Sequence, residues 1–183
     1  MVTIHPVTAE RWDDLAQVFG PHGARGSCWC VEWRLTSGEF SRSAPPERRE
    51  TLQNLVMRGE PVGLLAYLDG RPVGWCSVAP VSQYGRLVRS KTLPYPEEPG
   101  AWALTCFFMR AGFRRQGLSK ALLKAAIDYV QPAGAPALYA YPHRTAERVP
   151  SYSGSIWLYH DAEFEEMPSH STATLVMRRQ FVR

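Results

Sequence analysis

The chain has 183 residues, of which 45% are hydrophobic and 21% are charged, and its formal net charge is +4. A chain of this length can bury a substantial core, so we expect one domain spanning residues 1–183. The sequence isoelectric point of about 9.0 favours anionic ligands, but this charge is too small to indicate nucleic-acid binding by itself. The first residues lack a basic region followed by an apolar run, and no apolar run approaches the roughly 20 residues of a membrane helix. We therefore expect a cytoplasmic protein that does not bind membranes.

The chain contains four cysteines, namely Cys28, Cys30, Cys76 and Cys106. In a reducing cytosol these residues are expected to be thiols rather than disulfides. Cys28 and Cys30 are too close in sequence for an unstrained disulfide, and they lack the two-residue gap of common zinc knuckles. We expect no metal, although a site built from all four thiols remains an alternative.

The N-terminal part predicts a strand followed by two helices. Residues 2–7 read as a short strand, and Thr8 is placed to cap a helix whose apolar residues recur at helical spacing: Trp12, Leu15, Ala16 and Phe19. The aromatic segment 28–35 has no clear pattern. Ser43, Pro45 and Pro46 predict the start of a helix over 45–59, with a buried stripe of Leu52, Leu55 and Val56.

The remaining elements predict a sheet. Asp69 and Gly70 supply the positive-φ turn of a β-hairpin over residues 62–80. A polar loop is expected over 81–100, and a buried strand over 101–109. After a turn comes a helix with one apolar face, made of Leu118, Ala121, Leu122, Ala125 and Tyr129.

The C-terminal part predicts a strand at 137–142, a short helix at 153–162, and an antiparallel pair at 163–168 and 172–181. We expect an α/β fold with a single mixed sheet and flanking helices, whose central strand–helix–strand unit is parallel and right-handed.

The turn between the central strand and its helix has the pattern of a phosphate site. Gly112 and Gly117 are spaced as in a Walker A loop, but Leu118 occupies the position of the phosphate-binding lysine, so a nucleotide-triphosphate site is unsupported. No Gly-x-Gly-x-x-Gly dinucleotide pattern is present either. The unpaired amides at the start of the helix, with Gly117 and the small Ser119, predict a seat for a pyrophosphate.

The pattern Arg114-x-x-Gly117-x-Ser119 resembles the Arg/Gln-x-x-Gly-x-Gly/Ala signature of the GNAT superfamily of N-acetyltransferases, which bind acetyl-CoA. The resemblance runs from about Val2 to Val182 and is most specific over residues 101–164. The helix carrying Tyr159 resembles the Leu-Tyr-x-x-x-Gly-Phe helix of the family, with Phe164 in register. Two positions depart from the family pattern, because Ser119 replaces a Gly or Ala and Glu163 replaces a Gly.

The resemblance implies where acetyl-CoA binds and how its acetyl group reacts. The central strand should splay from the next strand, so that the backbone at Phe107, Phe108 and Met109 pairs with pantetheine and holds the thioester oxygen. The pyrophosphate contacts fall on the turn and the start of the helix: Arg114, Arg115, Gln116, Gly117, Leu118, Ser119 and Lys120. Tyr159 matches the family tyrosine that protonates the departing thiolate, because a phenol is protonated at neutral pH.

The acetyl acceptor and the general base are less defined. An alkyl amine must lose a proton before it attacks, so a carboxylate or histidine should lie near it. We select Glu32, within the aromatic segment, with His160 and Glu166 as alternatives. The acceptor is expected to be a small-molecule or protein amine. The aromatic residues Trp29, Trp33 and Tyr152 can stack on a cationic or aromatic amine, and the acidic stretches 95–100 and 163–168 can attract a positive one.

Two other functions remain alternatives. A non-catalytic acyl-CoA sensor would share the phosphate seat but would have no use for the proton donor Tyr159. A nucleic-acid binder would use the basic residues of 114–124, but no aromatic platform is interleaved with them, so we expect no nucleic-acid partner. The sequence is compatible with a homodimer.

Overall fold

The computed structural model describes residues 1–144 and 152–181. Within these ranges the strands are β1 (Val2–Pro6), β2 (Leu64–Leu68), β3 (Arg71–Pro80), β4 (Trp102–Met109), β5 (Ala137–Ala140), β6 (Glu165–Met167) and β7 (Val176–Gln180). The α-helices are α1 (Trp12–Phe19), α2 (Ser37–Arg42), α3 (Pro45–Met57), α4 (Gly85–Val88), α5 (Leu118–Val130) and α6 (Ile156–His160). No helix in the described ranges has the length and apolar character needed to cross a bilayer.

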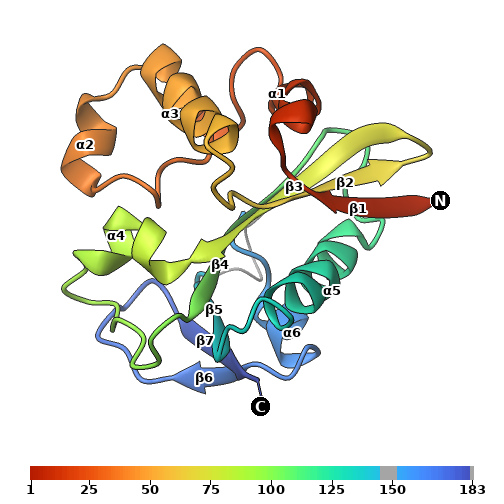
Figure 1. Cartoon of the computed structure of the whole chain (residues 1–183). Coiled ribbons are helices and arrows are strands. Elements are labelled where there is room, and N and C mark those ends of the chain that lie inside the picture. Colours follow the sequence, from red (N-terminus) through yellow and green to blue (C-terminus); the bar gives the residue numbers. More distant parts are fainter. Residues whose placement is uncertain (145–151, 182–183) are drawn as a thin grey trace.

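All described strands belong to one seven-stranded mixed sheet, ordered β1-β2-β3-β4-β5-β7-β6. Its neighbouring strands are antiparallel except for the central pair β4 and β5, which is parallel. Figure 1 shows α1 and α3 on one side of this sheet and α5 and α6 on the other. The expected α/β fold with a single mixed sheet is therefore confirmed.

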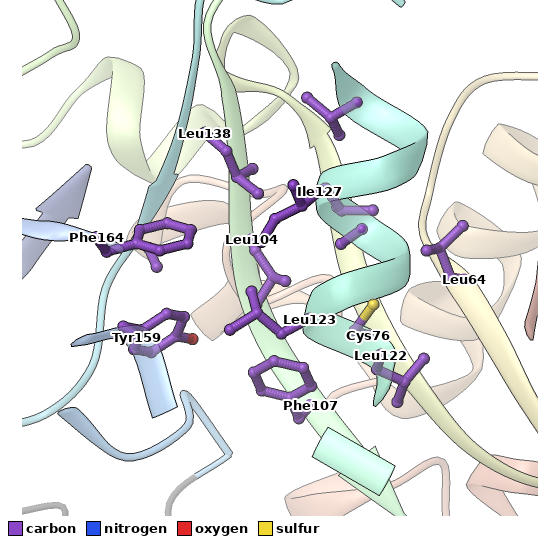
Figure 2. Close-up of a cluster of buried hydrophobic side chains, with 14 of the residues drawn as sticks. Leu64, Cys76, Leu104, Phe107, Leu122, Leu123, Ile127, Leu138, Tyr159 and Phe164 are labelled. Atoms are coloured by element: carbon purple, nitrogen blue, oxygen red, sulfur yellow. The ribbon is translucent and has the colours of Figure 1, made fainter. Parts of the chain in front are cut away.

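Each face of the sheet buries its own apolar cluster. On the α5 side, Leu104, Phe107 and Leu122 belong to a cluster that also contains Tyr159 and Phe164, as Figure 2 shows. On the α1 side, a second cluster surrounds Leu15, Trp29 and Trp75. Successive side chains of a strand point to opposite faces, so one strand can supply residues to both clusters. In β4, Phe107 joins the first cluster and Phe108 packs against the second.

The predicted cap at Thr8 is wrong. A short 3₁₀ turn (Ala9–Arg11) precedes α1, and the Thr8 hydroxyl accepts from the Arg11 guanidinium at 3.3 Å instead of from a helix amide. The apolar face of α1 is as expected, except that Val18 is buried while Ala16 is only half-buried. Helix α3 is confirmed, and Leu52 and Val56 are its buried residues.

Two short helices lie where none was expected. Helix α2 begins with a capping box, in which the Glu39 amide donates to the Thr36 hydroxyl and the Thr36 amide donates to the Glu39 carboxylate. Helix α4 lies inside the predicted loop 81–100. It is anchored by Leu87 and by the preceding Tyr84, both fully buried. The Thr-x-x-Glu pattern at residue 36 was the available sequence signal for α2.

The hairpin of β2 and β3 is confirmed, with positive φ angles of 48° at Asp69 and 76° at Gly70. In β4 the register against β3 shifts by one residue: Ser77 pairs with Cys106 and Val78 with Leu104. Thr105 is therefore the extra residue of a β-bulge, which bends β4. The parallel pairing with β5 covers only residues 102–104 of β4. Beyond Leu104 the two strands diverge, as the family resemblance implied.

The predicted apolar face of α5 is displaced. Its fully buried residues are Leu118, Leu122, Leu123, Ala126, Ile127 and Val130, whereas Ala121, Ala125 and Tyr129 are only half-buried. The displacement has a physical reason, since α5 contacts β2, β3 and β4 together and so buries two adjacent rows of side chains instead of one.

Candidate active site

The turn between β4 and α5 exposes backbone amides. Gly112 and Gly117 have φ angles of 88° and 76°, which are comfortable only for glycine, and Arg115 also has a positive φ of 63°. Gly117 is the N-cap of α5 and has no side chain to pair with the amides that follow it. Among the described residues, the backbone amides of 118–120, in the first turn of α5, have no hydrogen-bond partner. This turn therefore presents a row of free N–H groups at the positive end of a helix.

Charge and space around the turn also suit an anion. A Cβ built on Gly117 would meet no atom within 4 Å, so the space beside it is open. Arg114, Arg115 and Lys120 are exposed around the turn. The Gln116 side chain turns back instead, and its amide donates to the Gly112 carbonyl at 3.0 Å. The arrangement can hold a phosphate group, with Gln116 stabilising the turn.

The end of β4 supplies the next part of the site. Phe107 is buried in the α5-side cluster, whereas Phe108 is half-buried and its ring is stacked on Tyr152 at 6.2 Å. Met109 is buried and its side chain lies over Gly74. The backbone amide of Phe107, expected to be free, donates to the Tyr152 carbonyl at 2.5 Å. A ligand that pairs with this amide must therefore replace that hydrogen bond.

Tyr159 lies fully buried on the α5 side of the sheet, between Phe107 and Phe164 (Figure 2). Its hydroxyl donates to the Ser153 carbonyl at 2.5 Å. Burial raises the pKa of Tyr159 well above its ordinary value, which keeps the phenol protonated. Glu163, which replaces the Gly of the family pattern beyond this helix, has a positive φ of 60°, and its carboxylate pairs with Arg179 at 2.8 Å.

A cavity of about 800 Å³ lies on the other side of β4. Its wall includes the bulge residue Thr105 with Cys106 and Phe108, and it also contains side chains from the segment 24–37, from 86–93, and from the region after β5. Ser153 and Tyr152 belong to this wall as well, whereas Tyr159 does not. Ser153 therefore lies between the Tyr159 hydroxyl and the cavity.

Glu32 lies in the wall of this cavity, as its predicted role requires. Its carboxylate accepts from the Arg86 guanidinium at 2.5 Å and is about half exposed. His143, three residues beyond the end of β5, lines the same cavity and was missed by the sequence reasoning. A histidine after a central strand was the available signal. Glu32 and His143 are the carboxylate and the imidazole that line the cavity in the described part of the chain.

The other predicted residues of the acceptor side lie elsewhere. His160 is exposed beside Trp157, and Glu166 is exposed and pairs with Arg144 at 3.7 Å, so neither lines the cavity. The acidic stretches 95–100 and 163–168 do not line it either. Glu98 instead accepts from the Tyr139 hydroxyl at 2.7 Å and pairs with Arg178 at 3.1 Å.

Of the aromatic residues expected near the acceptor, Trp33 and Tyr152 line the cavity, whereas Trp29 is buried behind it among Trp12 and Phe19. Cys28, Cys30 and Cys106 also line the cavity. Within the described residues, no group of three or more His, Cys, Asp or Glu side chains is arranged to hold a metal ion.

Comparisons with known proteins agree with this architecture. The model of the acetyltransferase (GNAT) family matches residues 29–152. The PaiA N-acetyltransferase of Thermoplasma acidophilum, solved in complex with coenzyme A, has 16% sequence identity, a TM-score of 0.60 and 99% coverage of both chains. The ribosomal-protein-alanine N-acetyltransferase of Brucella melitensis has 18% identity and a TM-score of 0.59, with 98% of this chain and 99% of that chain covered.

A third solved structure is yncA of Salmonella typhimurium, described as a putative acetyltransferase with its cofactor acetyl-CoA. It has 13% identity and a TM-score of 0.58, and the match covers 98% of this chain and 93% of that chain. No curated protein matches the sequence. At these identities the solved structures establish the fold alone.

The fold and the site define an acyltransferase architecture, with a mixed sheet, a splayed parallel pair and an amide-rich turn between them. The family model covers more than half of the chain, and the chain belongs to the acetyltransferase (GNAT) family. The matched range ends at residue 152, before Tyr159, so the match does not cover this residue.

Proposed function

We propose that the protein transfers an acetyl group from acetyl-CoA to a primary amine by direct attack within a ternary complex. The proposal is carried by the position of β4, which connects two sites. The end of β4 leads into the open amide turn before α5, while its bulge at Thr105 and the adjacent Cys106 line the cavity on the opposite face. A donor bound at the turn can therefore extend along β4 toward an acceptor in the cavity.

The donor side uses the predicted residues. The amides of 114–120 hold the pyrophosphate, and Arg114, Arg115 and Lys120 supply the surrounding positive charge. The pantetheine arm runs along Phe107, Phe108 and Met109, and its carbonyl replaces Tyr152 at the Phe107 amide. Backbone N–H groups at the bulge then stabilise the oxyanion as the amine attacks the thioester carbonyl.

The acceptor side removes the amine proton. Glu32 and His143 are the two candidate bases, acting directly or through water. Tyr159 protonates the departing thiolate once Ser153 releases its hydroxyl.

The charges around the cavity favour an acceptor that also carries an anionic group. Its wall contains the cationic residues Arg25, Arg86, Arg89 and Lys91, against the single carboxylate of Glu32 in the described part of the chain. Arg86 is paired with Glu32, whereas Arg25, Arg89 and Lys91 are exposed. Such a rim attracts anionic molecules and repels polyamines. We therefore propose an amine that bears a carboxylate or phosphate, such as an amino acid or an acidic peptide.

Release of free thiol from acetyl-CoA, measured with a panel of amines, tests the proposal. Each amino acid is paired with its carboxamide, which lacks the anionic group. Loss of the carboxylate also lowers the pKa of the α-amine, so kcat/KM is expressed per concentration of neutral amine. We expect higher kcat/KM for the acid, and a loss of this preference in Arg89→Ala/Lys91→Ala and at high salt. Equal kcat/KM values for acid and carboxamide would contradict an anionic acceptor.

A non-catalytic acyl-CoA sensor is the second candidate. It is favoured by the buried Tyr159 hydroxyl and by the Tyr152 carbonyl at the Phe107 amide, because both groups are already paired. Binding of acetyl-CoA without release of thiol for any amine of the panel would support the sensor and overturn the transferase.

A further inference from the structure

Three of the four cysteine thiols meet in the wall of the acceptor cavity. The Cys30 sulfur lies 3.9 Å from that of Cys28 and 3.6 Å from that of Cys106. The fourth cysteine, Cys76, is fully buried in the cluster on the opposite face of the sheet. Cys28 and Cys30 belong to the N-terminal segment and Cys106 to β4, so the cluster joins two parts of the chain far apart in sequence.

The backbone at Trp29 creates this cluster. Trp29 and Cys30 have φ angles of 44° and 47°, a left-handed conformation that side chains rarely adopt. The Trp29 ring is buried and stacks on Trp12 at 6.2 Å, and its amide donates to the Gly23 carbonyl at 2.9 Å. Packing of Trp29 therefore holds a tight turn that brings Cys28 and Cys30 together beside β4.

The three thiols differ chemically. The side-chain hydrogen bond between Cys28 and Cys30 lowers the pKa of Cys28, and the Cys30 amide donates to the Cys28 sulfur at 3.3 Å. Burial raises the pKa of Cys30. Cys28 and Cys106 are half-buried and line the cavity. A reagent that enters the cavity therefore meets Cys28, whose lowered pKa favours the thiolate, and Cys30, whose raised pKa favours the neutral thiol, lies directly beside it.

We propose that Cys28, Cys30 and Cys106 form an oxidation site for hydroperoxides. The Cys28 thiolate attacks one peroxide oxygen, the O–O bond breaks, and the second oxygen leaves as water or alcohol after taking up a proton. The Cys30 sulfur then attacks the sulfur of the Cys28 sulfenic acid, and its proton leaves with the hydroxyl group as water. The two thiols supply the two electrons that reduce the peroxide.

The Cys28–Cys30 disulfide then undergoes thiol–disulfide exchange with Cys106. A bridge between Cys28 and Cys30 spans a single intervening residue and is strained, which makes it reactive toward a third thiol. The Cys106 thiolate attacks the Cys30 sulfur and displaces Cys28 as a thiolate, with no further electron transfer. The product is a Cys30–Cys106 disulfide, which ties the N-terminal turn to β4 beside the bulge at Thr105.

This bond would affect acetyl transfer, a consequence that rests on the proposed function. It fixes the cavity wall directly next to the β4 segment along which the thioester is proposed to lie. We expect the oxidised protein to lose most of its transfer activity and to regain it after reduction with dithiothreitol.

Peptide mapping without reduction tests the site after treatment with one equivalent of hydrogen peroxide, in the absence of acetyl-CoA. The wild type should yield the Cys30–Cys106 bridge. Cys106→Ala should stop at Cys28–Cys30, and Cys28→Ala should slow oxidation by roughly tenfold because the thiolate is lost. Cys76→Ala is the matched control and should give the wild-type bridge at the wild-type rate.

Peptide mapping tests the oxidation site, and the transfer activity of the oxidised protein tests the effect of the disulfide on acetyl transfer. An oxidation rate unchanged in Cys28→Ala, or a wild-type product without a bridge inside the cluster, would overturn the oxidation site whatever the activity. A Cys30–Cys106 bridge in a protein that keeps full transfer activity would overturn the effect on transfer. A protein that forms the bridge but never transfers acetyl groups would instead refute the proposed function and leave the oxidation site standing.

Discussion

At the residue scale, the hydroxyl of Tyr159 is both buried and hydrogen-bonded to Ser153. If it donates a proton to the leaving thiolate, Tyr159→Phe should lower kcat by about 10²-fold or more, without a matching loss of affinity for acetyl-CoA. Removing this one hydrogen bond should cost only about 1 kcal/mol of unfolding free energy. Steady-state kinetics and acetyl-CoA titration measure the two effects separately.

Tyr141 provides the matched control for that substitution. Its side chain is also buried, but its hydroxyl has no hydrogen-bond partner among the described residues. Tyr141→Phe should therefore leave kcat unchanged and be neutral or slightly stabilising. Equal losses of kcat in both variants would assign the effect to general packing and refute the role of Tyr159 as proton donor.

The thiol of Cys28 gives a prediction about pH. Its pKa is lowered chiefly by its side-chain hydrogen bond with Cys30, so more thiolate is present at neutral pH than for an ordinary cysteine. The rate of alkylation by iodoacetamide, followed at Cys28 by mass spectrometry, should reach its midpoint below the usual value of about 8.5. In Cys30→Ala this side-chain hydrogen bond is lost, whereas the backbone amide at position 30 still donates to the Cys28 sulfur, so the midpoint should rise. An unchanged midpoint would show that Cys30 does not set the pKa.

At the scale of elements, the apolar face that the sequence predicts for α5 differs from the face that the structure buries, and substitutions in α5 can test which face is correct. Leu123 is buried against the sheet although it lies outside the predicted apolar face. Leu123→Ala should lower the free energy of unfolding by about 2–5 kcal/mol, because it removes buried methyl groups and leaves a cavity. Lys124→Ala, an exposed change in the same turn, should cost at most about 0.5 kcal/mol. Urea unfolding of both variants measures the two losses of unfolding free energy. If Leu123→Ala loses as little as Lys124→Ala, the observed packing of α5 is contradicted.

Elements with strong local signals could be predicted from the sequence. The Asp69-Gly70 turn fixes the hairpin because its φ angles are positive, and Pro45 marks the start of α3. Helix α4 has no comparable signal, since it is held by buried anchors such as Leu87 rather than by helix propensity. The displaced buried face of α5 could not be predicted, because alanine is compatible with both buried and half-buried positions. In α5, Ala126 is buried, whereas Ala121 and Ala125 are half-buried.

At the scale of the whole molecule, the turn before α5 can be recognised in the sequence, whereas the cavity beside β4 cannot. The turn that we propose as the phosphate site could be recognised in the sequence because its residues are contiguous from Gly112 to Lys120. The cavity beside β4 could not be recognised, because it is assembled from segments far apart in sequence. For this reason His143 was missed. The meeting of Cys106 with Cys28 and Cys30 depends likewise on tertiary packing.

The central claim is that the turn before α5 holds the pyrophosphate of acetyl-CoA. Thermal unfolding with acetyl-CoA, and with ATP and NAD as control ligands, tests it most directly. A ligand at about a hundred times its dissociation constant adds about 2.7 kcal/mol, which raises Tm by roughly 5 to 10 °C for a domain of this size.

Ser119 allows a matched pair of variants, because it lies in the first turn of α5. Glutamate at this position suits the helix N-terminus but repels a phosphate, whereas alanine leaves the turn open. The account predicts that acetyl-CoA alone raises Tm, in the wild type and in Ser119→Ala but not in Ser119→Glu. The absence of a shift at saturating acetyl-CoA, or an equal shift in Ser119→Glu, would contradict it.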